Sequence, residues 1–137
     1  MIESIALLTT ATLFGGMILY SFGFAPLVFS QMPSEAAGPM IRNAFPWYYL
    51  FVIVAAAIAT AFLFFSGDAL ATSLLAATLV IGLFARQGLM PMINAARDKQ
   101  MAGDAAAKKR FGALHGVSVL LNFIQLGAIG WALVRFL

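Results

Sequence analysis

The sequence predicts an all-α protein, an integral membrane four-helix bundle that forms a single domain over residues 1–137. Hydrophobic residues make up 63% of the chain and charged residues only 9%, whereas a soluble domain has about 25% charged residues. The mean hydropathy is +0.98. A helix needs about 20 residues to cross a bilayer, so a chain of 137 residues has room for four spans and short loops.

The first span is expected over residues 5–29, where Pro26 should kink or end the last turns. The N-terminus lacks the positive charge of a secretory signal, so we expect it to remain part of this helix. The second span is expected over residues 47–65. It opens with three aromatic residues at 47–49, which are suited to the headgroup layer.

The third span is expected over residues 69–90, after a tight turn at residues 66–68 whose serine or aspartate can cap the helix. A polar helical extension should follow Pro91. The fourth span is expected over residues 111–135. Four spans joined in this way place both termini on the same side of the membrane.

Basic residues gather on the side opposite the termini. The termini side has only Arg135, and the other side has the remaining basic residues: Arg42, Arg86, Arg97, Lys99, Lys108, Lys109 and Arg110. The positive-inside rule therefore predicts cytoplasmic basic loops and both termini on the non-cytoplasmic side. We expect a bacterial inner membrane as the location. The net charge of +3 reflects this topology, and nucleic acid is not an expected partner.

A polar stripe is predicted on the fourth helix. His115, Ser118, Asn122 and Gln125 fall within an arc of roughly 80° on one helix face. Lipid cannot satisfy such groups, so this face should point at protein or at a water-filled cavity. One interpretation is interhelical hydrogen bonding that sets the register of the helices. The other is a pocket in which His115 acts as a ligand or proton carrier.

Two further groups of side chains are candidate sites for anions or lipid headgroups. Arg86 either extends towards the headgroups or binds a phosphate or carboxylate. The basic stretch with Arg97, Lys108, Lys109 and Arg110 either sets the topology or attracts anionic lipid. No acidic residue lies inside a span and the chain has no cysteine, which excludes a buried carboxylate dyad and thiolate chemistry.

Two segments resemble a known family. They are residues 22–29 followed by Phe-Pro-Trp-Tyr-Tyr at 45–49, and residues 111–122 with the arrangement F-x-x-x-H-x-x-S-x-x-x-N. Together they resemble the transmembrane protein 205-like family, a domain of unknown function found in small four-helix membrane proteins. The chain is also similar, more distantly, to small four-helix proteins that handle copper or porphyrin. It departs from their pattern because His115 is its single histidine.

These observations favour a non-enzymatic membrane protein, a subunit or a lipid- or partner-binding bundle, with no cofactor or metal expected. One alternative is a haem-, porphyrin- or metal-linked protein with His115 as the ligand. Another is an oligomeric transporter of small solutes, whose path the stripe would line. The expected partners are the lipid bilayer and either further copies of the chain or another membrane protein.

Overall fold

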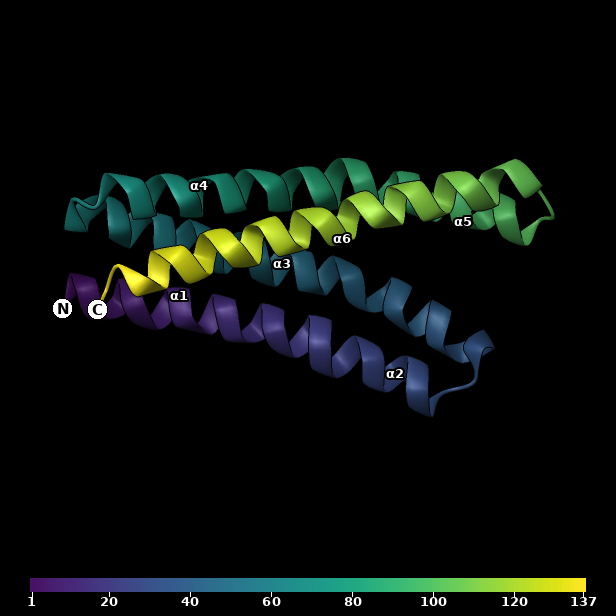
Figure 1. Ribbon diagram of the computed structural model, residues 1–137, viewed down its shortest axis with the longest axis horizontal. Coiled ribbons are helices and arrows are strands. Elements are labelled where there is room, and N and C mark those ends of the chain that lie inside the picture. The colour runs from purple at the N-terminus through teal and green to yellow at the C-terminus, as the bar shows by residue number, and fades with distance from the viewer.

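The structure is a computed structural model that describes residues 1–137, and it is entirely helical. Its elements form four continuous rods (Figure 1). The elements are α1 (Ile2–Ile18), η1 (Leu19–Phe24), α2 (Ala25–Gln31), α3 (Ser34–Ser66), α4 (Ala69–Phe84), η2 (Ala85–Leu89), α5 (Met90–Met101) and α6 (Ala105–Val134). The rods are α1–η1–α2, α3, α4–η2–α5 and α6. The prediction of an all-α four-helix bundle is confirmed.

The four rods have the length and composition of membrane spans, with 30, 33, 33 and 30 residues. At 1.5 Å per residue each is about 45–50 Å long, more than the roughly 30 Å of a hydrocarbon core. The predicted spans are therefore shorter than the helices. The largest difference is in α3, which begins at Ser34 and not at residue 47. Hydropathy marks only the part of a helix in lipid, while its hydrogen bonding continues through the headgroup layer.

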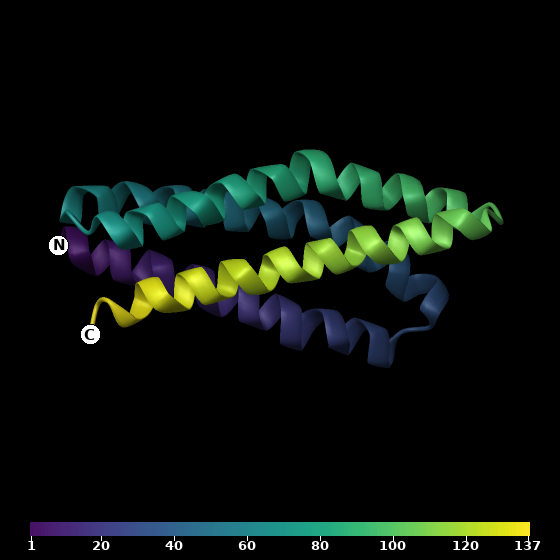
Figure 2. The ribbon, with the colours of Figure 1, turned by 45° about the horizontal axis from the view of Figure 1, so that its top comes forward.

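Both chain termini lie at one end of the bundle together with the α3–α4 turn (Figures 1 and 2). Gly67 ends α3 in the left-handed conformation at φ 84°, which costs glycine little. Asp68 then caps α4 by accepting a hydrogen bond from the Ala71 amide at 3.0 Å. The predicted cap is confirmed for the aspartate. Ser66 instead donates to the Leu63 carbonyl within α3.

The first and third rods each contain a π-helical segment just before a proline. The Ala25 amide donates to the Tyr20 carbonyl ahead of Pro26, and the Met90 amide donates to the Ala85 carbonyl ahead of Pro91. A proline ring clashes with the carbonyl four residues earlier in a regular α-helix, and a wider π turn is a common local adjustment. Pro26 thus leaves the first helix continuous as far as Gln31. Of the two expected effects of Pro26, a kink or an end to the helix, the end does not occur.

Glycines and alanines let the rods approach closely around α3. A side chain at Gly82 on α4 would meet Ile53 and Val52 of α3 at 3.3 and 3.4 Å. The main core cluster draws its buried residues from α1, α3, α4, η2 and α6. Two ion pairs fasten the ends. Arg135, directly after α6, meets Asp68 at 2.6 Å, and Arg42 of α3 meets Asp98 of α5 at 2.5 Å.

Candidate functional site

Three of the four stripe residues on α6 point into the bundle. Ser118 and Gln125 are buried and Asn122 is half-buried, but His115 is exposed. At 100° per residue, His115 lies about 60° from the centre of the buried face of α6. The expectation that the whole stripe faces protein or a cavity is therefore wrong for His115. Its imidazole instead stacks on the Phe111 ring, one turn earlier, with centroids 5.9 Å apart.

Asn122 joins three rods by hydrogen bonds. Its Oδ1 accepts a hydrogen bond from the Tyr48 hydroxyl of α3. Its Nδ2 donates to Ser21 Oγ of η1 at 3.0 Å. The side-chain amide therefore uses both its donor and its acceptor ends inside the protein, where lipid offers neither.

Ser118 and Gln125 make two further bonds between helices. Ser118 Oγ lies 3.1 Å from Tyr49 Oη on α3. Gln125 Nε2 donates to the backbone carbonyl of Thr78 on α4 at 2.9 Å. The Thr78 hydroxyl donates within its own helix, to the Leu74 carbonyl. Each inward residue of the stripe thus bonds to another helix, which fastens α6 to α3, α4 and η1.

The aromatic group at the start of the predicted second span is divided between two environments. Trp47 is 73% exposed, as suits a headgroup anchor, whereas Tyr48 and Tyr49 are only 7% and 6% exposed. The expectation of a three-residue anchor is therefore wrong for both tyrosines. Sequence reasoning missed these two tyrosines as hydrogen-bond partners of the stripe. Their two adjacent hydroxyls, available to a polar stripe on another helix, were a signal that could have predicted the pairing.

Tyr20 completes an aromatic cluster beside this network. Its ring stacks on Tyr48 with centroids 4.1 Å apart and also contacts Phe24 and Phe45. Its hydroxyl is buried and has no hydrogen-bond partner in the protein. The cluster packs η1 against α3, and Tyr48 belongs both to it and to the bonded pair with Asn122.

Arg86 and Arg97, two of the predicted anion-binding residues, have partners within the protein. Arg86 Nε donates a long hydrogen bond to the Pro46 carbonyl, at 3.4 Å. Arg97 lies over the Phe111 ring at 5.2 Å and donates to Gln100 at 3.2 Å. Arg97, Phe111 and His115 therefore form a stack along α5 and α6. Arg86 is not part of it.

The other predicted cations are exposed at the start of α6, and Lys108, Lys109 and Arg110 form no ion pair. A hollow of about 440 Å³ lies between α5 and α6 at this end. Lys99 and Arg110 both line it. Lys99 is a residue that sequence reasoning did not assign to the headgroup site, because only the packing of α5 against α6 brings it beside Arg110.

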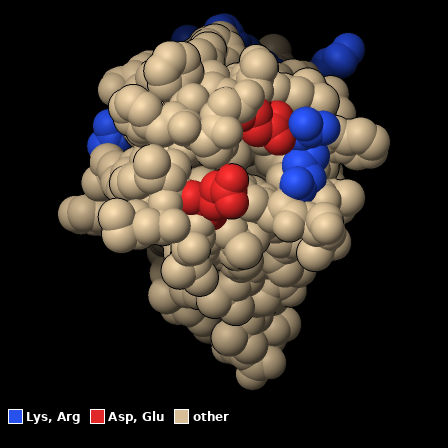
Figure 3. All heavy atoms as spheres, turned by 90° about the vertical axis from the view of Figure 1, so that its left-hand side faces the viewer, with Lys and Arg blue, Asp and Glu red and all other residues tan.

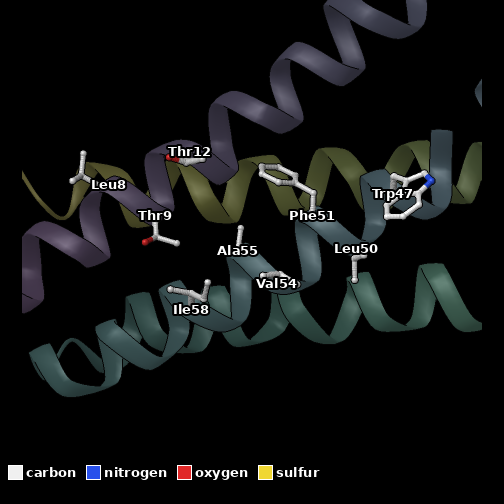
Figure 4. A pocket seen from close by; sticks show the side chains of 9 residues that line it. All are labelled: Leu8, Thr9, Thr12, Trp47, Leu50, Phe51, Val54, Ala55 and Ile58. Carbon is white, nitrogen blue, oxygen red and sulfur yellow. The ribbon is translucent and has the colours of Figure 1, made fainter.

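A second, larger hollow of about 560 Å³ lies between α1 and α3. Figure 4 shows Leu8, Thr9 and Thr12 on the α1 side, with Trp47 at one end of the α3 side. Seven of its nine residues are hydrophobic. No three His, Cys, Asp or Glu side chains gather in the structure in a way that suits a metal ion. The larger hollow is therefore lined mainly by apolar side chains, and the hollow at the basic end includes two cations and one acid in its lining.

Comparison with known proteins identifies the family of the chain. No curated protein and no solved structure matches the chain. A family match covers residues 8–102, which extend from α1 through α5 and include Ser21, Tyr48 and Tyr49. The helix with the polar stripe, α6, lies beyond the match. Since more than half of the chain is matched, the protein belongs to the family described as Domain of unknown function (DUF4149).

Proposed function

We propose that the protein is a non-enzymatic, lipid-binding membrane bundle. The observation that carries this proposal is that the inward polar groups of Ser118, Asn122 and Gln125 are already bonded within the bundle. They hold the helices in register, and the Tyr20 hydroxyl is the one buried side-chain polar atom without a partner. The exposed surface of the bundle is mainly apolar, and one end of it is positively charged.

The charge distribution supports binding of anionic lipid. Near the α5–α6 turn, several basic side chains have no carboxylate partner: Arg97, Lys99, Lys108, Lys109 and Arg110. Arg86, further along the third rod in η2, has none either. Of the nearby acids, Asp98 is paired with Arg42, and Asp104 accepts hydrogen bonds from the first amides of α6. Each exposed Lys or Arg near a membrane surface contributes about 1 kcal/mol of attraction to anionic lipid.

The same asymmetry supports an orientation. We place the basic end in the cytoplasm and both termini on the non-cytoplasmic side, in a bacterial inner membrane. The end with the termini is covered mainly by uncharged residues (Figure 3), and its one basic side chain, Arg135, is paired with Asp68. We also propose that the chain is related to the transmembrane protein 205-like family, on the two resembling segments.

Native mass spectrometry of the full-length protein tests the proposed function. We would add phosphatidylglycerol and phosphatidylcholine in equal amounts to the detergent-purified protein. We expect preferential retention of phosphatidylglycerol, and its retention should fall as salt is added because exposed charges are screened. Equal retention of the two lipids at low salt would refute the proposal.

The variant His115→Ala is the control for that experiment. His115 is exposed and makes no hydrogen bond in the structure, so lipid retention should be unchanged. The haem- or metal-linked alternative stays a prediction and is decided by the same spectra. A discrete non-lipid species that is bound by the native protein and lost in His115→Ala would favour that alternative over lipid binding. The transport alternative also stays a prediction, and it requires an oligomer in these spectra.

A further inference from the structure

The hollow between α5 and α6 combines an apolar floor with a basic rim. Its α5 wall includes Pro91, Met92 and Ala95, and its α6 wall includes Ala106 and Ala107. Alanine side chains on both walls leave the space open. Its volume of about 440 Å³ lies within the range of small-molecule sites, about 300–1,000 Å³.

The rim holds two unpaired cations on facing helices. Lys99 comes from the last turn of α5 and Arg110 from the second turn of α6, and neither has a carboxylate partner. The one acid that lines the hollow, Asp104, accepts hydrogen bonds from the amides of Ala106 and Ala107 at 2.9 and 3.2 Å. The three charges sum to a net +1. Because the acid is engaged with the helix start, the two cations are the groups free to meet a ligand.

Along α5, the hollow extends from the end of the predicted third span towards the α5–α6 turn. Pro91 lies next to the apolar end of the third rod, and Lys99 lies eight residues, or about 12 Å, further along α5. The stretch between them passes from hydrophobic residues to the charged residues Arg97 and Asp98. On α5 the lining therefore changes from apolar next to the predicted span to basic at Lys99, and on α6 Arg110 lies three residues further from the α5–α6 turn than Ala107.

We propose that this hollow is a binding site for one anionic phospholipid. Its phosphate is held between the Arg110 guanidinium and the Lys99 ammonium, and its glycerol and upper acyl carbons lie on the alanine floor. Guanidinium groups bind phosphate through two parallel hydrogen bonds. The site rests on the proposed function and specifies its ligand class and position.

The test is a phosphatidylglycerol titration of the full-length protein, read by native mass spectrometry as the occupancy of the first bound lipid. The variant Lys99→Gln/Arg110→Gln loses the charge-assisted hydrogen bonds to the phosphate and should bind this lipid at least about thirtyfold more weakly than the native protein. The control Lys108→Gln/Lys109→Gln removes the same charge from the same end but does not line the hollow. It should weaken the first lipid no more than threefold.

A second variant fills the hollow without changing charge. Ala95 is exposed and lines the floor, so Ala95→Phe should leave the fold intact and still reduce occupancy of the first lipid at least tenfold. Equal loss in the two charge variants would overturn the site while leaving lipid binding in place. No preference for phosphatidylglycerol in the native protein would overturn both. Displacement of the lipid by millimolar glycerol phosphate would also overturn the site, because a free headgroup lacks the acyl carbons that lie on the floor.

Discussion

The hydrogen bond between Tyr48 and Asn122 provides the sharpest test of how α6 is held. Asn122 bonds to Tyr48 and to Ser21, and interhelical bonds in membranes average about 0.6 kcal/mol with a maximum near 1.7. Asn122→Leu removes both bonds at similar volume and should lower the free energy of unfolding by about 1–3 kcal/mol. Tyr48→Phe removes one and should cost about 0.6–1.7 kcal/mol. The double variant should cost less than the sum, with a coupling energy of about 0.6–1.7 kcal/mol.

Reversible unfolding in mixed micelles, driven by added dodecyl sulfate, measures the four free energies of this cycle. The matched control replaces the neighbouring tyrosine, because Tyr49 bonds to Ser118 and not to Asn122. A cycle of Tyr49→Phe with Asn122→Leu should show coupling below about 0.3 kcal/mol. Coupling that small between Tyr48 and Asn122 would refute the reasoning that the stripe fastens the helices.

Other perturbations have equally definite outcomes. A methyl group at Gly16 would lie 2.5 Å from the Phe51 ring, whereas one at Gly15 has no neighbour within 4 Å. The free energy of unfolding of Gly16→Ala should therefore be about 1–3 kcal/mol lower than that of Gly15→Ala. Equal free energies of unfolding would contradict the close packing of α1 on α3. The hydrogen bond from Arg135 holds the pKa of Asp68 below its usual range. The resulting stabilisation is present above the unfolded pKa of about 3.9 and is lost as pH falls through the lower folded pKa. Melting curves between pH 5 and pH 2 should therefore fall more steeply for the native protein than for Arg135→Gln, and parallel curves would show that the pair contributes nothing. A reporter fused to the C-terminus should be active only outside the cytoplasm, and cytoplasmic activity would reverse the proposed orientation.

The helices and the cap of α4 could be predicted from sequence because they depend on local chemistry, whereas the Asp104 cap of α6 was not predicted. Hydropathy located the apolar part of each rod, and the turn at residues 66–68 provided the Asp68 cap that the structure contains. The helix ends were less readable. α3 runs through Pro39 and Pro46, because the rest of a helical segment already held in place can absorb a missing amide hydrogen bond. A proline signals a break only when the surrounding chain does not compensate.

The polar stripe was readable as a pattern, but its partners were not. Helical periodicity put His115 on the same arc as Ser118, Asn122 and Gln125, yet it could not locate the centre of the buried face. Packing turned that face towards α3 and α4 and left His115 at the edge, where it is exposed. The residues that share the hollow between α5 and α6 could not be predicted from the sequence either. Lys99 and Arg110 meet around one cavity only because α5 folds back along α6.

By itself, the sequence determined that this protein is an all-helical membrane bundle with one basic end. Hydropathy and charge can be evaluated for each segment without knowing its neighbours. A backbone in lipid must also satisfy its own hydrogen bonds, which requires each segment to be a helix. The tertiary structure alone decided what the polar groups do. The bonds of Ser118 and Asn122 reach residues 69, 74 and 101 positions away, and no local rule specifies such pairs. They form because close packing of small residues brings the helices together, and in lipid a buried polar group must bond to whichever helix lies beside it.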